Sequence, residues 1–321
     1  MEVVAGIHRI ETTTSDGRLL CCYLISGDIC VLVDAGEART PVEAIWPYLA
    51  SRGIDLNTIR LIFITHADTD HFGGTSAVLE RTSALVAAHE PDAAWVSDPQ
   101  RVLTERYGQL KPSHNISYDS LTEQRLRGQL GARVPVSLWL GEGCSLGVGP
   151  DRQLHVLHLP GHTLGHLGLY DTVSGVALIG DAALGDGLRN RDGRVVIPPS
   201  YYAPSQYLQT LAKLEKLSPR VVLTGHLPIL SGEAIAELLA VSRGFVLRVE
   251  EAVATAIMRK SGPWTLLSIS EELRESLGPW PPSCLPGFAR SVLGHLHEFE
   301  TRGEIVREEG RTRPQAWRHH L

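Results

Sequence analysis

Two histidines and two aspartates lie within six consecutive positions of the chain, in the segment His66-Ala-Asp-Thr-Asp-His71. Two imidazoles and two carboxylates offer nitrogen and oxygen donors together, a mixture that suits a divalent transition metal. Burying both aspartates in an apolar core without compensation would be costly, so the alternative interpretation is a solvated polar turn. The density of ligand-type side chains favours the metal site.

Three more polar residues share the setting of this segment, because each follows a short apolar run and lies in a glycine-containing loop: His162, Asp181 and His226. Loops at the ends of strands are held in place by those strands and commonly carry functional side chains. We therefore expect the polar side chains of these loops to converge on one centre.

Five motifs in a fixed order carry a resemblance to a known family. They are VLVDAG ending at Gly36, THADTDHFGG from Thr65 to Gly74, PGHTLGH from Pro160 to His166, LIGDA around Asp181, and LTGH ending at His226. Together they resemble the metallo-β-lactamase superfamily, whose signature is T-H-x-H-x-D-H-x-G-G, over roughly residues 7–229. The resemblance implies an α+β fold, an αββα sandwich with metals at one edge between two β-sheets.

The resemblance also implies a ligand set for two divalent metal ions. The first ion would be held by His66, Asp68 and His162, the second by Asp70, His71 and His226, and Asp181 would bridge them. The residue at the position of Asp34 usually braces the ligand loop in this family, and such outer contacts orient ligands without binding metal. His166 is a second candidate for this bracing role, with simple packing as its alternative.

Position 68 departs from the family pattern, because Asp68 stands where a histidine is usual. A carboxylate is harder than an imidazole and adds a negative charge. It should therefore weaken the Lewis acidity of the first ion and shift the metal preference toward iron or manganese. We expect Asp68 to be a ligand and zinc to be the resident metal, with iron or manganese as the alternatives that Asp68 raises.

The chemistry expected from two cations is hydrolysis by a bridging hydroxide, which attacks a carbonyl or phosphoryl centre. Asp70 is the expected catalytic residue, because it would both ligate a metal and orient the nucleophile. The primary hypothesis is a hydrolase of a small ester, thioester or lactone. One alternative is a phosphodiesterase or endoribonuclease, and another is an iron-dependent non-hydrolytic dioxygenase or ligand sensor.

The segment after Asp181 should border the metal edge and contains the candidates for substrate binding. Arg189 and Arg191 are placed to bind a carboxylate or phosphate of the substrate, since a guanidinium pairs with both oxygens at once. Tyr201 is a candidate for the wall of a pocket. The alternatives are an exposed hairpin for the arginines and packing under the next helix for Tyr201.

Hydrophobic periodicity predicts strands that alternate with helices in the first two thirds of the chain. The strands are predicted over 7–11, 19–25, 29–33, 61–65, 85–88, 153–159 and 220–223, and the helices over 41–52, 75–81 and 204–217. Residues of about 90–131 are mostly polar and are predicted to be a helical insertion. These elements define a predicted catalytic domain of residues 1–231.

The composition shifts after about residue 231, and residues 232–321 are predicted to form a small, mainly helical domain. Its helices are predicted over 233–260, 266–277 and 285–301, followed by a hairpin over 303–317. This order loosely resembles the winged-helix-like domain at the C-terminus of some superfamily members. We expect this domain to shape the substrate mouth or to form a homodimer contact.

The overall composition narrows the class of protein. The 321 residues carry a net charge of −6 and are 43% hydrophobic, which excludes a disordered chain and disfavours a nucleic-acid binder held by phosphate contacts. Five cysteines without a C-x-x-C pair, and an N-terminus without a secretory pattern, indicate a cytoplasmic location. The expected partner is a small-molecule substrate, not a nucleic acid or a membrane.

Overall fold

The computed structural model describes residues 1–259, 263–278, 280–308 and 314–319. Its first β-sheet has seven strands, antiparallel from β1 to β4 and parallel from β4 to β7. In sheet order they are β1 (Glu2–Val4), β2 (Ile7–Thr13), β3 (Leu19–Ile25), β4 (Cys30–Val33), β5 (Ile59–Phe63), β6 (Leu85–Ala88) and β7 (Leu138–Trp139).

The second sheet has six strands in the order β15-β14-β11-β10-β9-β8, antiparallel except for the pair β11 and β14. Their bounds are β8 (Ser145–Gly149), β9 (Arg152–His158), β10 (Leu167–Asp171), β11 (Val176–Gly180), β14 (Val221–Thr224) and β15 (Leu230–Ser231). A separate two-stranded hairpin, β12 (Leu188–Arg189) and β13 (Val195–Ile197), follows β11.

Alternation along the strands decides which layer each side chain joins. In β3, Cys21 and Tyr23 face the space between the two sheets, whereas Cys22 and Leu24 face the helices outside the first sheet. Successive side chains of a strand point to opposite faces, so a strand that is apolar on both faces must be covered twice. Every one of these side chains is buried, which agrees with their coverage by two layers.

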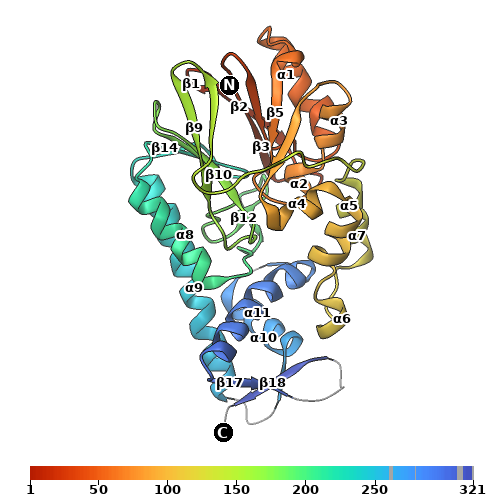
Figure 1. Cartoon of the computed structure of the whole chain (residues 1–321). Helices are drawn as coiled ribbons and strands as arrows, with labels where there is room; N and C mark the ends of the chain where they lie inside the picture. Colours follow the sequence, from red (N-terminus) through yellow and green to blue (C-terminus); the bar gives the residue numbers. More distant parts are fainter. Residues whose placement is uncertain (260–262, 279, 309–313, 320–321) are drawn as a thin grey trace.

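Helices cover both outer faces of the sandwich (Figure 1). The first sheet is covered by η1 (Pro41–Ile45), α1 (Trp46–Ser51), α3 (Thr75–Leu79) and α4 (Glu90–Ser97), and the second by α8 (Pro204–Leu217) and α9 (Glu233–Arg259). This arrangement is the αββα sandwich, and the predicted fold class is confirmed.

The predicted insertion is helical and runs from the first sheet toward the C-terminal helices (Figure 1). It contains α4, α5 (Pro99–Arg101), η3 (Val102–Tyr107), α6 (Lys111–His114) and α7 (Ser120–Gly128). Asp98 and Asp119 cap two of these helices by accepting hydrogen bonds from the backbone amides of Gln100 at 3.0 Å and Thr122 at 2.7 Å. The insertion thereby holds η3, whose side chains reach the site described below.

The C-terminal region begins with α9 and continues with three further helical elements and a small sheet. They are β16 (Trp264–Thr265), α10 (Leu266–Leu277), η4 (Pro282–Cys284), α11 (Leu285–Thr301), β17 (Ile305–Arg307) and β18 (Ala316–His319), with the sheet order β16-β18-β17. The bounds predicted for α10 and α11 agree with the structure. The predicted hairpin is β17 and β18, but 309–313 in it, and Lys260 in the first predicted helix, lie outside the described residues.

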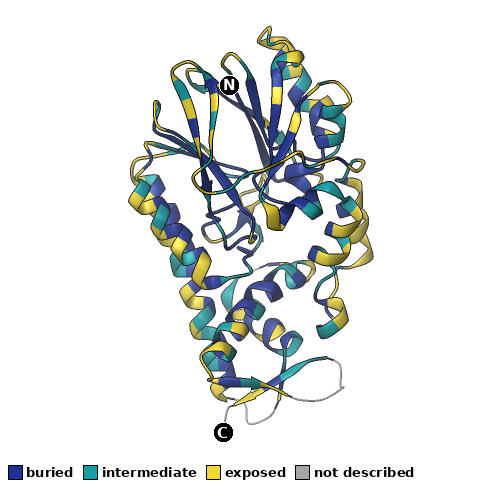
Figure 2. Cartoon of the chain, in the orientation of Figure 1, coloured by how far each residue is buried: buried dark blue, intermediate teal, exposed yellow. Residues whose placement is uncertain are grey.

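The C-terminal helices share one hydrophobic core with the second sheet (Figure 2). Leu157 and Ile179 of the sheet belong to the same buried cluster as Phe245 of α9 and Phe288 of α11. A Cβ on Gly294 would lie 2.6 Å from the carbonyl oxygen of Tyr202, so only a glycine lets α11 approach this backbone so closely. None of the described helices is long and apolar enough to span a membrane.

A buried Tyr201–His295 contact joins the sandwich to α11, with 3.0 Å between the tyrosine hydroxyl and His295 Nε2. Burial lowers the pKa of His295 from 6.5 to about 3, so the folded protein keeps this imidazole neutral in mild acid. The unfolded chain binds the proton below pH 6.5. Between pH 6.5 and about 3 the free energy of unfolding therefore decreases by about 1.4 kcal/mol for each unit by which the pH falls.

We expect His295→Gln to flatten the acid limb of the stability curve, because glutamine still accepts a hydrogen bond but does not titrate. The free energy of unfolding of both proteins is measured by urea denaturation from pH 7 to pH 4. Two curves that stay parallel over this range would show that His295 does not titrate on unfolding.

Candidate metal centre

All seven predicted ligands lie at one edge of the sandwich, at the ends of neighbouring strands. His66 follows β5, and the short helix α2 (Thr69–Phe72) directly after it carries Asp70 and His71. His162 follows β9, Asp181 follows β11 and His226 follows β14. The strands thus hold loops that are distant in sequence side by side, as the sequence analysis expected.

Asp68 lies between two imidazoles in the first group of ligand-type side chains. Its Oδ2 is 2.8 Å from Nε2 of His162 and 3.4 Å from Nε2 of His66. One ligand atom from each of the three residues falls within 4.8 Å of the others. A single ion placed among these atoms would contact all three.

The second group lies beside the first and is formed by Asp70, His71 and His226. Nε2 of His226 is 3.3 Å from Nε2 of His71 and 3.5 Å from Oδ2 of Asp70. Asp181 adds two carboxylate oxygens, Oδ1 at 3.6 Å from His71 Nε2 and Oδ2 at 3.4 Å from His226 Nε2. Asp181 also groups with His66 and His71, so it connects the two sets.

The four imidazoles are oriented by hydrogen bonds on their outer nitrogen, Nδ1. The partners are the hydroxyl of Thr65 for His66 (3.0 Å), Oδ2 of Asp34 for His71 (2.7 Å), the carbonyl of Ser200 for His162 (2.6 Å) and the carbonyl of Leu19 for His226 (2.8 Å). A backbone carbonyl only accepts, so Nδ1 of His162 and of His226 must carry the proton. Their Nε2 lone pairs therefore point into the centre.

This donor set fits divalent cations. In the tautomers that the carbonyls impose on His162 and His226, Nε2 is an acceptor, yet it faces a carboxylate oxygen or another Nε2 at 2.8–3.5 Å. Two buried atoms of the centre, Nε2 of His66 and Oδ1 of Asp181, have no hydrogen-bond partner among the described residues. Lone pairs that face one another without protons are repulsive, and a cation between them removes the repulsion.

Charge within the centre shifts the pKa of its buried groups. Burial alone would raise the pKa of Asp181, but the imidazoles of His226 and His71 hold it well below its usual range. Burial would likewise lower the pKa of His71, but the carboxylates of Asp181 and Asp34 raise it well above its ordinary value. Asp181 is therefore an anion in the folded protein, as a bridging ligand requires.

Three residues brace the ligand loops from behind. Asp34 adopts a left-handed backbone conformation (φ 58°) and accepts hydrogen bonds from the backbone amide and hydroxyl of Thr65 as well as from His71. His166 accepts a hydrogen bond from the backbone amide of Asp181 at 3.0 Å and stacks on His66. Asp92, which the sequence analysis missed, accepts hydrogen bonds from Ala67, Thr163 and Gly165 and so ties two ligand loops together.

Asp68 has two further partners that the sequence analysis also missed, both from η3 of the insertion. Oδ1 of Asp68 accepts hydrogen bonds from Nε of Arg106 and from the hydroxyl of Tyr107, each at 2.7 Å. Burial would raise the pKa of Asp68, but the Arg106 guanidinium and the neighbouring histidines hold it well below its usual range. No local pattern distinguishes Arg106 from neighbouring arginines, so only the structure reveals the pair.

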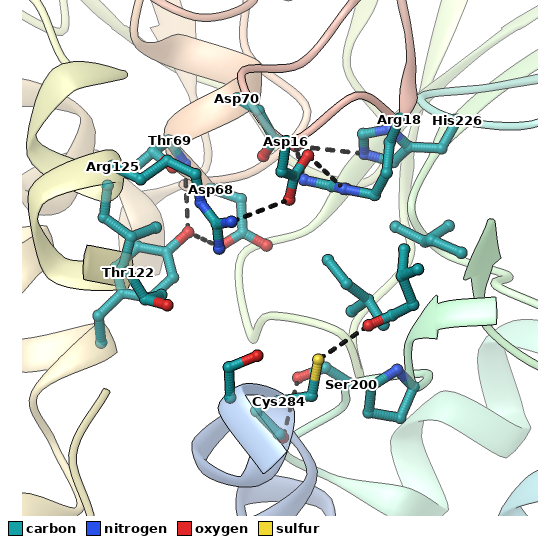
Figure 3. A pocket seen from close by; sticks show the side chains of 18 of the residues that line it. Asp16, Arg18, Asp68, Thr69, Asp70, Thr122, Arg125, Ser200, His226 and Cys284 are labelled. Atoms are coloured by element: carbon teal, nitrogen blue, oxygen red, sulfur yellow. Dashed lines mark hydrogen bonds and ion pairs between the residues drawn. The ribbon is translucent and has the colours of Figure 1, made fainter. Parts of the chain in front are cut away.

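A cavity of about 290 Å³ opens over this centre (Figure 3). Asp68, Asp70 and His226 line one side of it, and Ser200 and Cys284 lie across from them. The Cys284 thiol donates a hydrogen bond to the carbonyl of Val196, and burial raises its pKa to about 11. The thiol therefore stays protonated at neutral pH, which disfavours a cysteine nucleophile.

The three predicted substrate contacts do not line this cavity, which corrects the sequence-based assignment. Tyr201 is fully buried in the core against His295, as its packing alternative stated. Arg189 is exposed and pairs with Asp186 at 2.7 Å, and Arg191 is exposed as well. Their hairpin instead lines the cavity with a polar side chain and apolar ones: Leu188, Asn190, Val196 and Ile197.

Comparison with known proteins agrees with this fold and site. The family model of the metallo-β-lactamase superfamily matches residues 21–226, and the chain belongs to that superfamily of metal-dependent proteins. Over their full lengths, the chain and a metallo-β-lactamase family protein from Thermus thermophilus, TTHA1429, superpose with a TM-score of 0.73 at 23% identity, covering 99% of each. That likeness concerns the fold alone.

Among curated relatives, the chain is 27% identical to the probable metallo-hydrolase YqjP of Bacillus subtilis, over 71% of this chain and 73% of that protein. It is 30% identical to a hydroxyacylglutathione hydrolase of Cereibacter sphaeroides, over 63% of this chain and 58% of that protein. It is 28% identical to the acyl-coenzyme A thioesterase MBLAC2 of Gallus gallus, over 56% of this chain and 60% of that protein. These relatives support a metallo-hydrolase.

We expect Arg106→Met to destabilise the protein by about 3–5 kcal/mol, because it leaves the buried Asp68 carboxylate without its cation. The free energy of unfolding is measured by urea denaturation of the metal-depleted proteins at pH 7. Arg101→Met is the control, since the Arg101–Glu105 pair is about half exposed on the same stretch of chain and contributes little. Equal midpoints for the two variants would show that the Arg106–Asp68 pair does not stabilise the fold.

Proposed function

We propose that this protein is a hydrolase of a small thioester that uses two divalent metal ions. One observation carries the proposal: four oriented imidazoles and three carboxylates face one another at the edge of a cavity of about 290 Å³. A cavity of this size suits a small molecule better than a folded nucleic acid. The choice of a thioester among esters, thioesters and lactones is supported by the names of the hydroxyacylglutathione hydrolase and the acyl-coenzyme A thioesterase.

His66, Asp68 and His162 would hold one ion, Asp70, His71 and His226 the other, and Asp181 both. When bound, the ions polarise the acyl oxygen and lower the pKa of a coordinated water. Asp70 lines the cavity, and Arg18 donates a hydrogen bond to its Oδ2 at 3.2 Å, which fixes the carboxylate. We assign to Oδ1 of Asp70 the proton of the attacking water. The water oxygen bonds to the acyl carbon, the carbon–sulfur bond breaks, and the proton passes to the departing thiolate.

We expect prolonged chelation to abolish thioester hydrolysis and added zinc to restore it, because no described residue of the cavity replaces the Lewis acid. The rate of thiol release is measured before chelation, after it and after metal addition. Asp181→Asn, which weakens the link between the two groups, should remain inactive after zinc is restored. Full activity in the metal-depleted protein would contradict a metal-dependent hydrolase.

Zinc is the metal we propose, with iron or manganese as the alternatives that Asp68 raises. Because Arg106 and Tyr107 occupy Oδ1 of Asp68, only Oδ2 is free to contact an ion. The positive charge of Arg106 offsets the negative charge of the Asp68 carboxylate and repels a cation, so the first ion should bind more weakly than the second.

We expect Asp68→Ala to weaken binding of the first ion and to lower the metal content below two ions per chain, because only His66, His162 and the shared Asp181 would remain to hold it. Elemental analysis of the purified protein and the variant gives both the stoichiometry and the metal. His158→Ala is the control, since His158 is the last residue of β9, the strand that precedes His162, but its ring bonds to the carbonyl of Leu164. An unchanged stoichiometry in Asp68→Ala would remove Asp68 from the ligands.

The other sequence-based hypotheses remain predictions. An endoribonuclease or phosphodiesterase would cleave RNA or a phosphodiester with the metal found, and a dioxygenase or sensor would consume or bind oxygen with iron. A homodimer contact through the C-terminal region likewise stays a prediction. A cytoplasmic location is supported by the five cysteines, all of which are free thiols.

A further inference from the structure

One face of α11 forms the wall of the cavity that lies away from the metal centre. Gly287 and Arg290 of α11, together with its N-cap residue Cys284, recur every three residues and all line the cavity. Residues three apart share one face of a helix, so the start of α11 presents a single surface to the cavity. The C-terminal region therefore supplies part of the substrate site, and Arg290 is its charged residue.

Arg290 is a buried cation without an anion. Its relative exposure is 6%, its Nε has no hydrogen-bond partner, and none of the described carboxylates forms an ion pair with it. The other guanidiniums near the cavity are paired: Arg18 with Asp16 and Asp70, Arg125 with Asp16 at 3.8 Å, and Arg106 with Asp68. A buried charge is costly unless an anion compensates it, so a ligand that supplies the anion would bind favourably here.

Two tyrosine rings hold the Arg290 guanidinium in place. Its Cζ lies 5.7 Å from the ring centroid of Tyr107 and 5.6 Å from that of Tyr202. The same rings stack with Arg106, at 5.9 Å and 5.2 Å. Aromatic faces attract a guanidinium and restrict its rotation but do not use its N–H groups, which stay available for a carboxylate or phosphate.

Tyr118 adds a second donor at the same place. A Cβ built on Gly287 would lie 3.5 Å from the Tyr118 hydroxyl and 3.8 Å from Nη2 of Arg290. Both donor atoms therefore flank one point beside a residue that has no side chain. Tyr118 lines the cavity, and its hydroxyl has no hydrogen bond to another described residue that would compete for a ligand.

The distance to the reacting centre is short. The Tyr107 ring that stacks under Arg290 also donates its hydroxyl to Asp68 at 2.7 Å, so one tyrosine ring separates Arg290 from a predicted metal ligand. A substrate whose acyl carbon lies at the metal centre would reach Arg290 with a short arm. A guanidinium and a phenol hydroxyl together recognise an oxyanion.

We propose that Arg290 and Tyr118 bind an anionic group of the substrate, so that the protein acts on thioesters that carry a carboxylate or phosphate near the scissile bond. This inference rests on the proposed thioester hydrolysis for its kinetic consequence. The anion site itself follows from Arg290, Tyr118 and Gly287 and is tested separately by binding.

The kinetic test compares three matched thioesters whose short arm ends in a carboxylate, a phosphonate or a neutral carboxamide. We expect Arg290→Gln to raise the KM for the preferred anionic thioester about tenfold or more and to change its kcat little, because a charge-assisted contact is lost. The KM for the carboxamide should change much less than the KM for the anionic thioester. The larger loss, with carboxylate or with phosphonate, identifies the anion.

The binding test uses the unreactive thioether analogues of the same compounds with the metal-loaded protein, measured by calorimetry. Arg290→Gln and Tyr118→Phe should weaken the anionic thioether, and Arg290→Lys should recover part of the affinity. Arg248→Gln is the control, because Arg248 stacks on Phe245 in the same region without lining the cavity. Equal affinities of the wild type and Arg290→Gln for every anionic thioether would overturn the anion site.

The two proposals fail in different ways. If no thioester is hydrolysed with any metal but Arg290→Gln weakens thioether binding, the hydrolase proposal fails and the anion site stands. If the carboxamide and anionic thioesters are hydrolysed alike by the wild type and Arg290→Gln, the hydrolase stands and the anion site fails.

Discussion

The orientation of four imidazoles is the constraint on which the centre of this protein depends. Each ring uses its outer nitrogen to bond to the surrounding protein, and for His162 and His226 the partner is a backbone carbonyl. The proton of these two rings is then fixed on the outer nitrogen, and their inner lone pairs must face the aspartates. Folding thus brings lone pairs of nitrogen and oxygen close together, and their repulsion is removed when a cation binds between them. Metal binding should therefore stabilise the fold.

Compensation of buried charge explains how the protein accommodates an aspartate at position 68. Arg106 reaches Asp68 from the helical insertion, where its guanidinium is fully buried and packed against aromatic rings. The carboxylate that departs from the superfamily pattern is therefore neutralised on one oxygen and free on the other. The insertion and the altered ligand form one structural unit, because neither charge would be tolerated in the interior alone.

The C-terminal region acts on the same cavity from the opposite side. The guanidiniums of Arg106 and Arg290 pack against the same two rings, those of Tyr107 and Tyr202. Only Arg106 has a carboxylate partner among the described residues. Arg106 therefore stabilises the fold by its ion pair with Asp68, and we assign to Arg290 the binding of the anionic group of the substrate. Since α11 shares its core with the second sheet, the region that recognises the substrate is held rigidly against the region that would react with it.

The residues alone predicted the bounds of α10 and α11 and the seven polar side chains that converge after strands, whereas the sandwich was implied by the resemblance of the five motifs to the superfamily. The local patterns are a period near 3.6 in these helices and ligand-type residues in the loops that follow short apolar runs. Only the tertiary structure decided that Arg106 pairs with Asp68, that Arg290 has no carboxylate partner among the described residues, and that Tyr201 lies in the core rather than in the cavity. Local periodicity states which face of an element is apolar, but the identity of the distant side chain that meets that face depends on how whole elements pack.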